Sequence, residues 1–587
     1  MGRFQDFAGE LRRRRVFRAI VAYAIAAFAI LQVVEPVMHG LELPDWVLKT
    51  VVVALGVGFP IVVILAWAFD LKATGIERAQ AAAAGRAGSP RGARLALLLV
   101  GLGMLAAAPG LVYYLVFRDR AAAQARTRAP VGGVLPSVAV LPFVDMSAQR
   151  DQEYFSDGLA EEILNALSHI DGLRVTGRTS SFSFKGKSDD LRAIGQKLNV
   201  GAVLEGSVRR DGNRIRVTAQ VVNVADGFHI WSETYDRELQ GVFAVQDDIA
   251  RSVAEALKVR LLPSRAASAD GKGAANPEAY TQFLLGRQLF NQVSNDSVRR
   301  SAEAFQRAVS LDPTFAPAWA ALAMSVQDLN HDAPGATEEN RRRGRAAAEK
   351  AVSLDPGLAE GYNARGVLRA RWDWDWPGAQ ADLDRARALQ PGDAVSQRRY
   401  GILRLMLGQP SEAISALRRA IDLDPLSAIA WSWLAKAYVS TGDFPQANGA
   451  LERALQIAPE SEDLRASRGV LSILEGKPAE ALKAIDGIHD EGERLAGLAL
   501  AEHDLGHPAA AQKALASLKA GYPGHPYEIA LVHAWFGERD SAFEWLDRAY
   551  ASRDWSLADV RYDPFLKPIR DDARYAQLLR RMNLPVD

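Results

Sequence analysis

The stretch that decides the fold is residues 428–461, AIAWSWLAKAYVSTGDFPQANGALERALQIAPES. Counted from residue 428, signature positions 4, 7, 8, 11, 20, 24, 27 and 32 hold Trp431, Leu434, Ala435, Tyr438, Ala447, Leu451, Ala454 and Pro459. Apolar residues at these spacings give each of two consecutive helices one apolar face. Small residues at positions 8 and 20 let the two helices approach, and the proline ends the second helix. The stretch therefore predicts a helical hairpin.

The hairpin recurs along the chain. Prolines end similar helices at positions 313, 356, 391, 425 and 459, at spacings of 43, 35, 34 and 34 residues. A period of 34 residues with this signature is similar to the tetratricopeptide (TPR) repeat. We therefore expect an all-helical TPR solenoid of about eight helix pairs over 275–551, with an insertion near 331–340. Residues 552–587 resemble the C-terminal cap of TPR proteins, which covers the last apolar face.

Residues 136–262 predict a small α+β domain with the element order βαβαβββα. SVAVLPF at 137–143 is an apolar run of strand length. A helix is expected after a candidate N-cap, Asp157, because Leu159, Ile163 and Leu167 recur at helical spacing. Glu161 and Glu162 on this helix are expected to face solvent. The remaining elements are expected at 173–176, 190–198, 202–209, 214–224, 228–235 and 243–257.

Four blocks of this domain carry a family resemblance: SVAVLPFVDMS, DGLAEEILNALS, VLEGSVRRDGNRIRVTAQVVN and HIWSETYDR. They resemble the TolB-like, or FlgO-type, N-terminal domain of bacterial proteins. ELRRRRVFRAIVAYAI near the N-terminus resembles the membrane region that precedes this domain in many of them. The resemblance implies an envelope or signalling context, and it implies no reaction and no catalytic residues.

Three apolar segments, at about 20–38, 50–69 and 95–117, are long enough to predict three transmembrane helices within a membrane region at 19–117. Basic residues number six in 1–18, one in 39–49 and five in 70–94, which predicts a cytoplasmic N-terminus. The expected location is therefore the bacterial inner membrane, multi-pass, with a linker at 118–135 and periplasmic domains beyond it. Small-xxx-small pairs such as Ala54–Gly58 allow a homo-oligomer.

Composition excludes several functional classes. Lysine and arginine total 70, as do aspartate and glutamate, and this balance argues against a nucleic-acid partner. The chain has no cysteine, so it has no thiol chemistry and no cysteine-ligated metal. The run Thr179-Ser180-Ser181 lacks the context of a nucleophile and is expected to form a turn. The cluster WDWDW at 372–376 predicts a packed helix corner, with ligand stacking as the alternative. We expect no catalytic residue, cofactor or metal.

The favoured function is therefore a membrane-anchored scaffold that binds a protein or peptide partner. In TPR folds the first helix of each pair lines the partner groove at signature positions 2, 5, 9, 12 and 13. These positions hold Asn363, Arg371, Arg398 and Lys436 in the middle units, and Asp463, Glu493 and Asp504 later. The predicted groove is cationic in its middle and suits an acidic segment or a C-terminal carboxylate, although ordinary solvated charge is the alternative.

A signalling transducer is the second functional hypothesis. It is suggested by TolB-domain proteins that carry adenylate cyclase domains, and a cyclase domain is not recognisable in this sequence.

Overall fold

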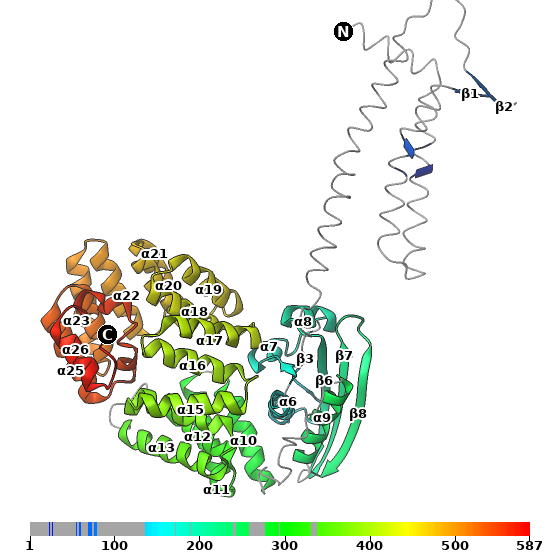
Figure 1. Cartoon of the computed structure of the whole chain (residues 1–587), viewed down its shortest axis with the longest axis horizontal. Helices are drawn as coiled ribbons and strands as arrows, with labels where there is room; N and C mark the ends of the chain where they lie inside the picture. Colours follow the sequence, from blue (N-terminus) through cyan, green and yellow to red (C-terminus); the bar gives the residue numbers. More distant parts are fainter. Residues whose placement is uncertain are drawn as a thin grey trace, which may run out of the picture. The chain divides into compact units, whose positions relative to one another are not determined.

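The computed structural model describes residues 136–170, 172–187, 189–238, 242–257, 276–292, 294–329 and 337–586, with short stretches before residue 79. The chain divides into two compact units, Met1–Gly133 and Val134–Asp587. In the first unit, β1 (Phe69–Lys72) and β2 (Gly75–Arg78) form an antiparallel pair (Figure 1).

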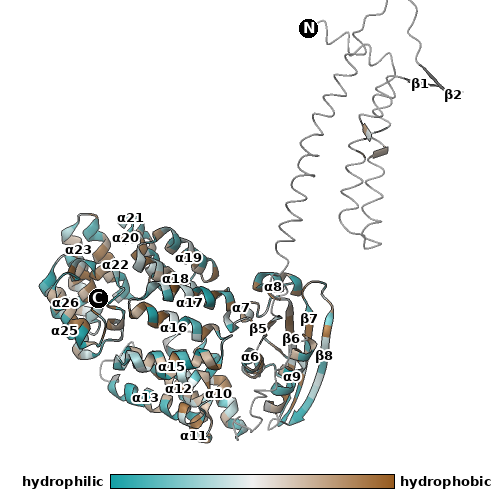
Figure 2. Ribbon diagram, viewed as in Figure 1, coloured by the Kyte–Doolittle hydropathy of each residue, from teal (hydrophilic) through white to brown (hydrophobic). Residues whose placement is uncertain are grey.

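The described residues correct the predicted fold class and location. Among them, no helix combines the length and apolarity that crossing a bilayer requires. The longest, α13 (Thr337–Leu354), has 18 residues and is rich in charge, as its teal colour in Figure 2 shows. The three predicted spans lie outside the described residues, apart from a few isolated positions. The prediction of a multi-pass membrane protein is therefore wrong on this structure. The prediction rested on hydropathy alone.

The second unit begins with a sheet domain, residues 136–257. Its sheet has the order β5-β3-β6-β7-β8, and β4 also pairs with β6. β3 is parallel to β5 and β6, whereas β6, β7 and β8 form an antiparallel meander. The strands are β3 (Ser137–Val140), β4 (Val144–Asp145), β5 (Arg174–Val175), β6 (Ala202–Asp211), β7 (Arg214–Asn223) and β8 (His229–Glu238).

Helices cover both faces of this sheet. α6 (Glu153–Ser168) and α9 (Val242–Ala256) bury their apolar residues against one face, where Val138, Val140 and Val217 are fully buried. α8 (Leu191–Leu198) packs on the other face. α7 (Arg178–Phe182) is a short helix at the position where a turn was predicted.

The predicted strands of the meander are confirmed, but the start of the first helix is not. α6 begins at Glu153, so Asp157 lies inside the helix rather than capping it. Asp157 is buried and forms an ion pair with Lys185. Glu161 is also buried, and both Glu161 and Glu162 pair with Arg287, so their predicted exposure to solvent is wrong. Helical periodicity shows which face is apolar, but it cannot show that a second element covers the polar face.

The repeat array follows as eight helix pairs within the described residues. In each pair the two helices pack against each other, and the last turn of most second helices precedes a proline. The pairs are α10 (Pro277–Phe290) with α11 (Asn295–Leu311), α12 (Ala316–Asp328) with α13, α14 (Ala359–Leu368) with α15 (Trp376–Leu389), α16 (Ala394–Met406) with α17 (Pro410–Leu423), α18 (Ala428–Thr441) with α19 (Phe444–Ile457), α20 (Glu462–Leu474) with α21 (Pro478–Ile485), α22 (Glu491–Asp504) with α23 (Pro508–Gly521), and α24 (Pro526–Trp535) with α25 (Arg539–Ser552).

The contacts between pairs define an inner and an outer side. Each first helix from α10 to α22 contacts the first helix of the next pair, and each second helix from α11 to α23 contacts the first helix that follows it. The closer spacing of the first helices places them on the inside of the curve. We call the surface they form the inner face.

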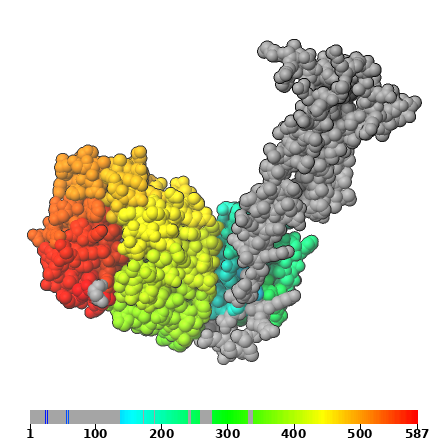
Figure 3. Space-filling view, turned by 45° about the horizontal axis from the view of Figure 1, so that its top comes forward, coloured from blue at the N-terminus to red at the C-terminus, as the bar shows by residue number. Residues whose placement is uncertain are grey.

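A C-terminal cap, residues 553–586, closes the array. It contains η6 (Trp555–Asp559), η7 (Pro564–Ile569) and α26 (Ala573–Arg581). The cap returns to the third and fourth pairs, where the indole nitrogen of Trp376 donates to the Met582 carbonyl at 2.6 Å. Figure 3 shows this red segment against the yellow-green part of the array. Trp372, Trp374 and Trp376 are all at least 97% buried, which confirms the packed corner predicted for WDWDW.

Candidate partner-binding face

Two of the predicted partner residues are engaged inside the protein. Asn363 is 2% exposed, and its Nδ2 donates to Ser396 Oγ at 2.7 Å. Its Oδ1 is buried and has no partner among the described residues. Arg371 is 5% exposed, and its guanidinium donates to Asp559 at 3.1 Å and lies 4.1 Å from the centre of the Trp555 ring. Arg371 thus anchors the C-terminal cap.

The third predicted residue, Arg398, lies half-buried on α16 beside Arg399. Neither guanidinium forms a hydrogen bond or an ion pair with another described residue. Burial, followed by the neighbouring charge of Arg398, lowers the pKa of Arg399 to about 10, while the charges of Asp393, Asp328 and Glu360 oppose this lowering. Burying a charge is costly unless the charge is paired. These partly dehydrated guanidinium groups are therefore expected to bind an anion that another molecule supplies.

The fourth residue, Lys436, is exposed on α18, whose neighbour on the inner face is α16. Its ammonium lies 4.6 Å from the centre of the Trp433 ring. Two apolar side chains on the same two helices are also open to solvent: Val395 is 38% exposed and Ile429 is 48% exposed. Cationic and apolar groups therefore alternate across α16 and α18.

The charge of the inner face reverses towards the C-terminus. Burial, followed by the charges of Asp463 and Asp490, raises the pKa of Glu493 to about 7, while Lys436 lowers it. Burial, followed by Asp554, raises the pKa of Glu528 to about 8. Asp504 instead accepts a hydrogen bond from the Trp535 indole at 2.9 Å. Lys436 thus stands at the boundary between a cationic and an acidic stretch.

The sheet domain covers the inner face at its N-terminal end. The Arg287 guanidinium on α10 forms ion pairs with Glu161 and Glu162 on α6. Burial, together with the charges of Glu161 and Glu360, raises the pKa of Glu162 to about 7, although the charge of Arg287 opposes the rise. Because Glu360 lies on α14, α6 is close to the first helices of both the first and the third pair.

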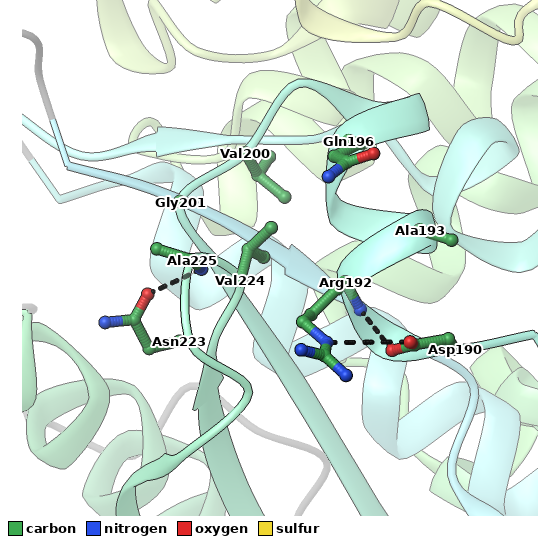
Figure 4. A pocket seen from close by; sticks show the side chains of 9 residues that line it. All are labelled: Asp190, Arg192, Ala193, Gln196, Val200, Gly201, Asn223, Val224 and Ala225. Carbon is green, nitrogen blue, oxygen red and sulfur yellow. Dashed lines mark hydrogen bonds and ion pairs between the residues drawn. The ribbon is translucent and has the colours of Figure 1, made fainter. Parts of the chain in front are cut away.

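A separate hollow of about 700 Å³ lies in the sheet domain (Figure 4). It is lined by α8 and by the β7–β8 turn, including Arg192, Gln196 and Val224. Two of its polar side chains bond within their own loops: Asp190 accepts from the Arg192 backbone at 2.9 Å, and Asn223 accepts from the Ala225 backbone at 2.9 Å. This hollow offers no converging set of free donors or acceptors.

Sequence reasoning missed Arg399, Trp433 and the two exposed apolar residues of this face. Val395 and Ile429 both occupy signature position 2 of their repeats, and the same position holds Glu360, Asp463 and Glu493. The pattern was therefore present in the sequence.

Comparison with known families supports the repeats. The family model "Tetratricopeptide repeat" matches residues 375–428, 399–462 and 434–492. The model "HilA/YgeH-like transcriptional regulator, second domain" matches residues 135–252. The TolB-like resemblance of this domain stays a prediction.

One curated relative is "Putative adenylate cyclase 3" of Rhizobium meliloti (strain 1021), which is 41% identical over 206 residues. The match covers 35% of this chain and 35% of that protein, so the chain spans about a third of the relative's length.

Solved TPR structures are also similar. A thermophilic TPR protein of Thermus thermophilus is 22% identical, with 33% of this chain and 98% of that chain covered and a TM-score of 0.29. YrrB, a TPR protein with an unusual peptide-binding site, is 19% identical, with 36% and 98% covered and a TM-score of 0.24. The family match shows that the chain contains tetratricopeptide repeats.

Proposed function

We propose that this protein is a non-catalytic interaction scaffold whose repeat array binds a protein or peptide partner. The observation that carries the proposal is the pair of half-buried guanidinium groups of Arg398 and Arg399 on the inner face, neither of which bonds to another described residue. They lie next to a helix that presents Lys436, Trp433 and Ile429. TolB-like character of the sheet domain, and a signalling or envelope context, belong to the same proposal.

The chemistry of this face selects an extended acidic segment. Carboxylates suit Arg398 and Arg399, because guanidinium groups bind them through two parallel hydrogen bonds. Apolar side chains of the partner would pack on Val395 and Ile429, which are exposed by 38% and 48%. Asp463 and Glu493 repel acidic residues, so the negative end of the segment is expected over α16 rather than over α20.

Selection of a random peptide library on the purified protein tests this specificity. We expect the recovered peptides to be rich in Asp and Glu with interspersed apolar residues, and their affinity to fall as salt rises, because exposed charges are screened. The double substitution Arg398→Glu with Lys436→Glu should abolish binding of these peptides.

A matched control reverses the same charges elsewhere. Arg453 and Lys483 are exposed on the second helices α19 and α21, so Arg453→Glu with Lys483→Glu should leave peptide binding unchanged. If the variant with Arg398→Glu and Lys436→Glu keeps its helical content and binds the peptides as tightly as the wild type does, α16 and α18 are not the binding site.

The match to a protein named putative adenylate cyclase supports one alternative, a signalling component with cyclase activity. Incubation of the purified chain with ATP and Mg²⁺ or Mn²⁺ separates the two functions. Formation of cyclic AMP above a heat-inactivated control would favour the enzyme, and its absence together with peptide binding would favour the scaffold.

A further inference from the structure

The outermost strand of the sheet domain, β8, pairs on one side only within the part of the chain that the structure describes. It is the last strand in the order β5-β3-β6-β7-β8, and it lies at the rim of the sheet in Figure 1. Its pairing with β7 is regular from Trp231 to Glu238. The outward N–H and C=O groups of such an edge strand can form hydrogen bonds with a further strand.

The two edges of this sheet differ in how they are protected. At the other edge, β5 has two residues, and just beyond it the Gly177 N–H donates to the Leu423 carbonyl of the repeat array at 2.8 Å. Proteins usually protect an edge in this way, with a short strand or a covering element. In contrast, β8 has ten residues without proline or glycine, and Tyr235 alone among them is buried. β8 is therefore the open edge of the domain.

Two charged side chains on this strand are open to another molecule. Glu233 and Arg237 are exposed, and they lie on the same face of β8 because they are four residues apart. Glu233 accepts a hydrogen bond from the Tyr235 hydroxyl at 3.0 Å, and neither Glu233 nor Arg237 forms an ion pair with a described residue. On the opposite face, by comparison, Asp236 is already paired with Arg216 at 2.6 Å.

A second copy of β8 supplies the matching charges. When two identical strands pair antiparallel about a twofold axis, residues at equal distances before and after the central residue lie opposite each other. With Tyr235 at the centre, Glu233 of each copy lies opposite Arg237 of the other copy. The same side chains thus form two ion pairs across the contact, and opposite charges in this position stabilise paired strands.

The remaining residues also fit this register. Thr234 lies opposite Asp236, and Ser232 lies opposite Glu238. Each carboxylate of the strand therefore faces a guanidinium or a hydroxyl group of the second copy, and no like charges lie opposite each other.

Neighbouring registers are less favourable. A centre at Glu233, Asp236 or Arg237 would place two identical charges directly opposite each other, which is destabilising. A centre at Thr234 would place Glu233 opposite Tyr235, so the carboxylate would not meet a cation. The charges of the strand thus select the register centred on Tyr235.

We propose that two copies of this chain pair antiparallel through their β8 strands, centred on Tyr235, and so join their sheets into one continuous sheet. A contact made by one strand edge is small, so the dimer is expected to dissociate in the micromolar range. The contact involves no residue of α16 or α18, and the inference is therefore independent of the proposed partner-binding face.

Charge reversal tests the register. In Arg237→Glu, and separately in Glu233→Arg, both ion pairs become like-charge pairs. Each substitution should raise the dissociation constant of the dimer roughly thirtyfold, measured by sedimentation of the full chain. An equimolar mixture of the two variants should regain about the wild-type affinity, because positions 233 and 237 then carry opposite charges across the contact. Arg192→Glu, at an exposed position on α8, should leave the dissociation constant unchanged.

Cysteine pairing tests the geometry independently. The natural chain has no cysteine, so Ser232→Cys with Glu238→Cys places thiols opposite each other between two copies. Within one copy these positions are about 20 Å apart along the strand, too far for a disulfide. Oxidation should therefore yield a covalent dimer, whereas Ser232→Cys with Thr234→Cys, whose positions are not opposite in this register, should remain mostly monomeric.

Three results would overturn the proposal. The first is a wild-type chain that stays monomeric at tens of micromolar. The second is a dimer that Arg237→Glu leaves unchanged, and the third is a mixture of the two folded charge variants that binds no more tightly than either variant alone.

Discussion

Leu434→Ala probes whether the repeats pack as their register requires. Leu434 is 4% exposed and lies in a cluster with Leu417, Ala447 and Leu451, between the two helices of its pair and the preceding second helix. The substitution removes three carbon groups, which at about 0.8 kcal/mol each gives about 2.4 kcal/mol of lost transfer free energy. The cavity left behind brings the expected cost to about 3–4 kcal/mol.

Local hydrogen exchange is the appropriate assay, because a chain of 587 residues does not have to unfold in one step. Repeats couple mainly to their neighbours, so lost protection should centre on residues about 393–490. Ile429→Ala on the same helix is the matched control. Ile429 is 48% exposed, and its truncation should change the local free energy of opening by less than about 0.5 kcal/mol. Two results would refute the assigned register. One is a loss of local free energy in Leu434→Ala as small as that in the control, and the other is a loss of protection spread evenly over the array.

Two further predictions concern buried charge. Because the pKa of Glu528 rises to about 8 on folding, its ionisation destabilises the folded array as pH increases from the ordinary glutamate range through 8. The melting temperature should therefore fall from about pH 5 to pH 8 and level off above that, and Glu528→Gln should reduce the fall; an unchanged pH profile would contradict the burial of this carboxyl group. Arg371→Met should lower the free energy of unfolding by about 3–5 kcal/mol, because Asp559 loses its ion-pair partner. The loss should be measured as a lower melting temperature and as faster hydrogen exchange in η6. Normal protection of η6 in this variant would show that Arg371 does not hold the cap.

The sequence alone determined the repeat architecture. The 34-residue spacing, the small residues at the helix crossings and the prolines at the corners are local features, and they predict helices and their ends. The meander of the sheet domain was equally accessible, because two short turns with glycine separate runs of strand-forming residues. Burial of the three tryptophans in WDWDW also followed, since large aromatic residues at a helix corner are normally packed.

The tertiary structure decided which charges are free. Arg371 and Asp559 lie 188 residues apart, and Ser180 and Asp424 lie 244 residues apart, so no local pattern could pair them. The same limit explains Glu161, which has the sequence pattern of a solvated residue but is buried against Arg287. The periodicity of apolar residues reports on one or two turns of a helix. The partner of a charged side chain depends instead on which distant elements the curvature of the array brings together. For that reason the inner face and Arg398 could be located from the sequence, whereas only the folded chain shows that neither Arg398 nor Arg399 bonds to another described residue.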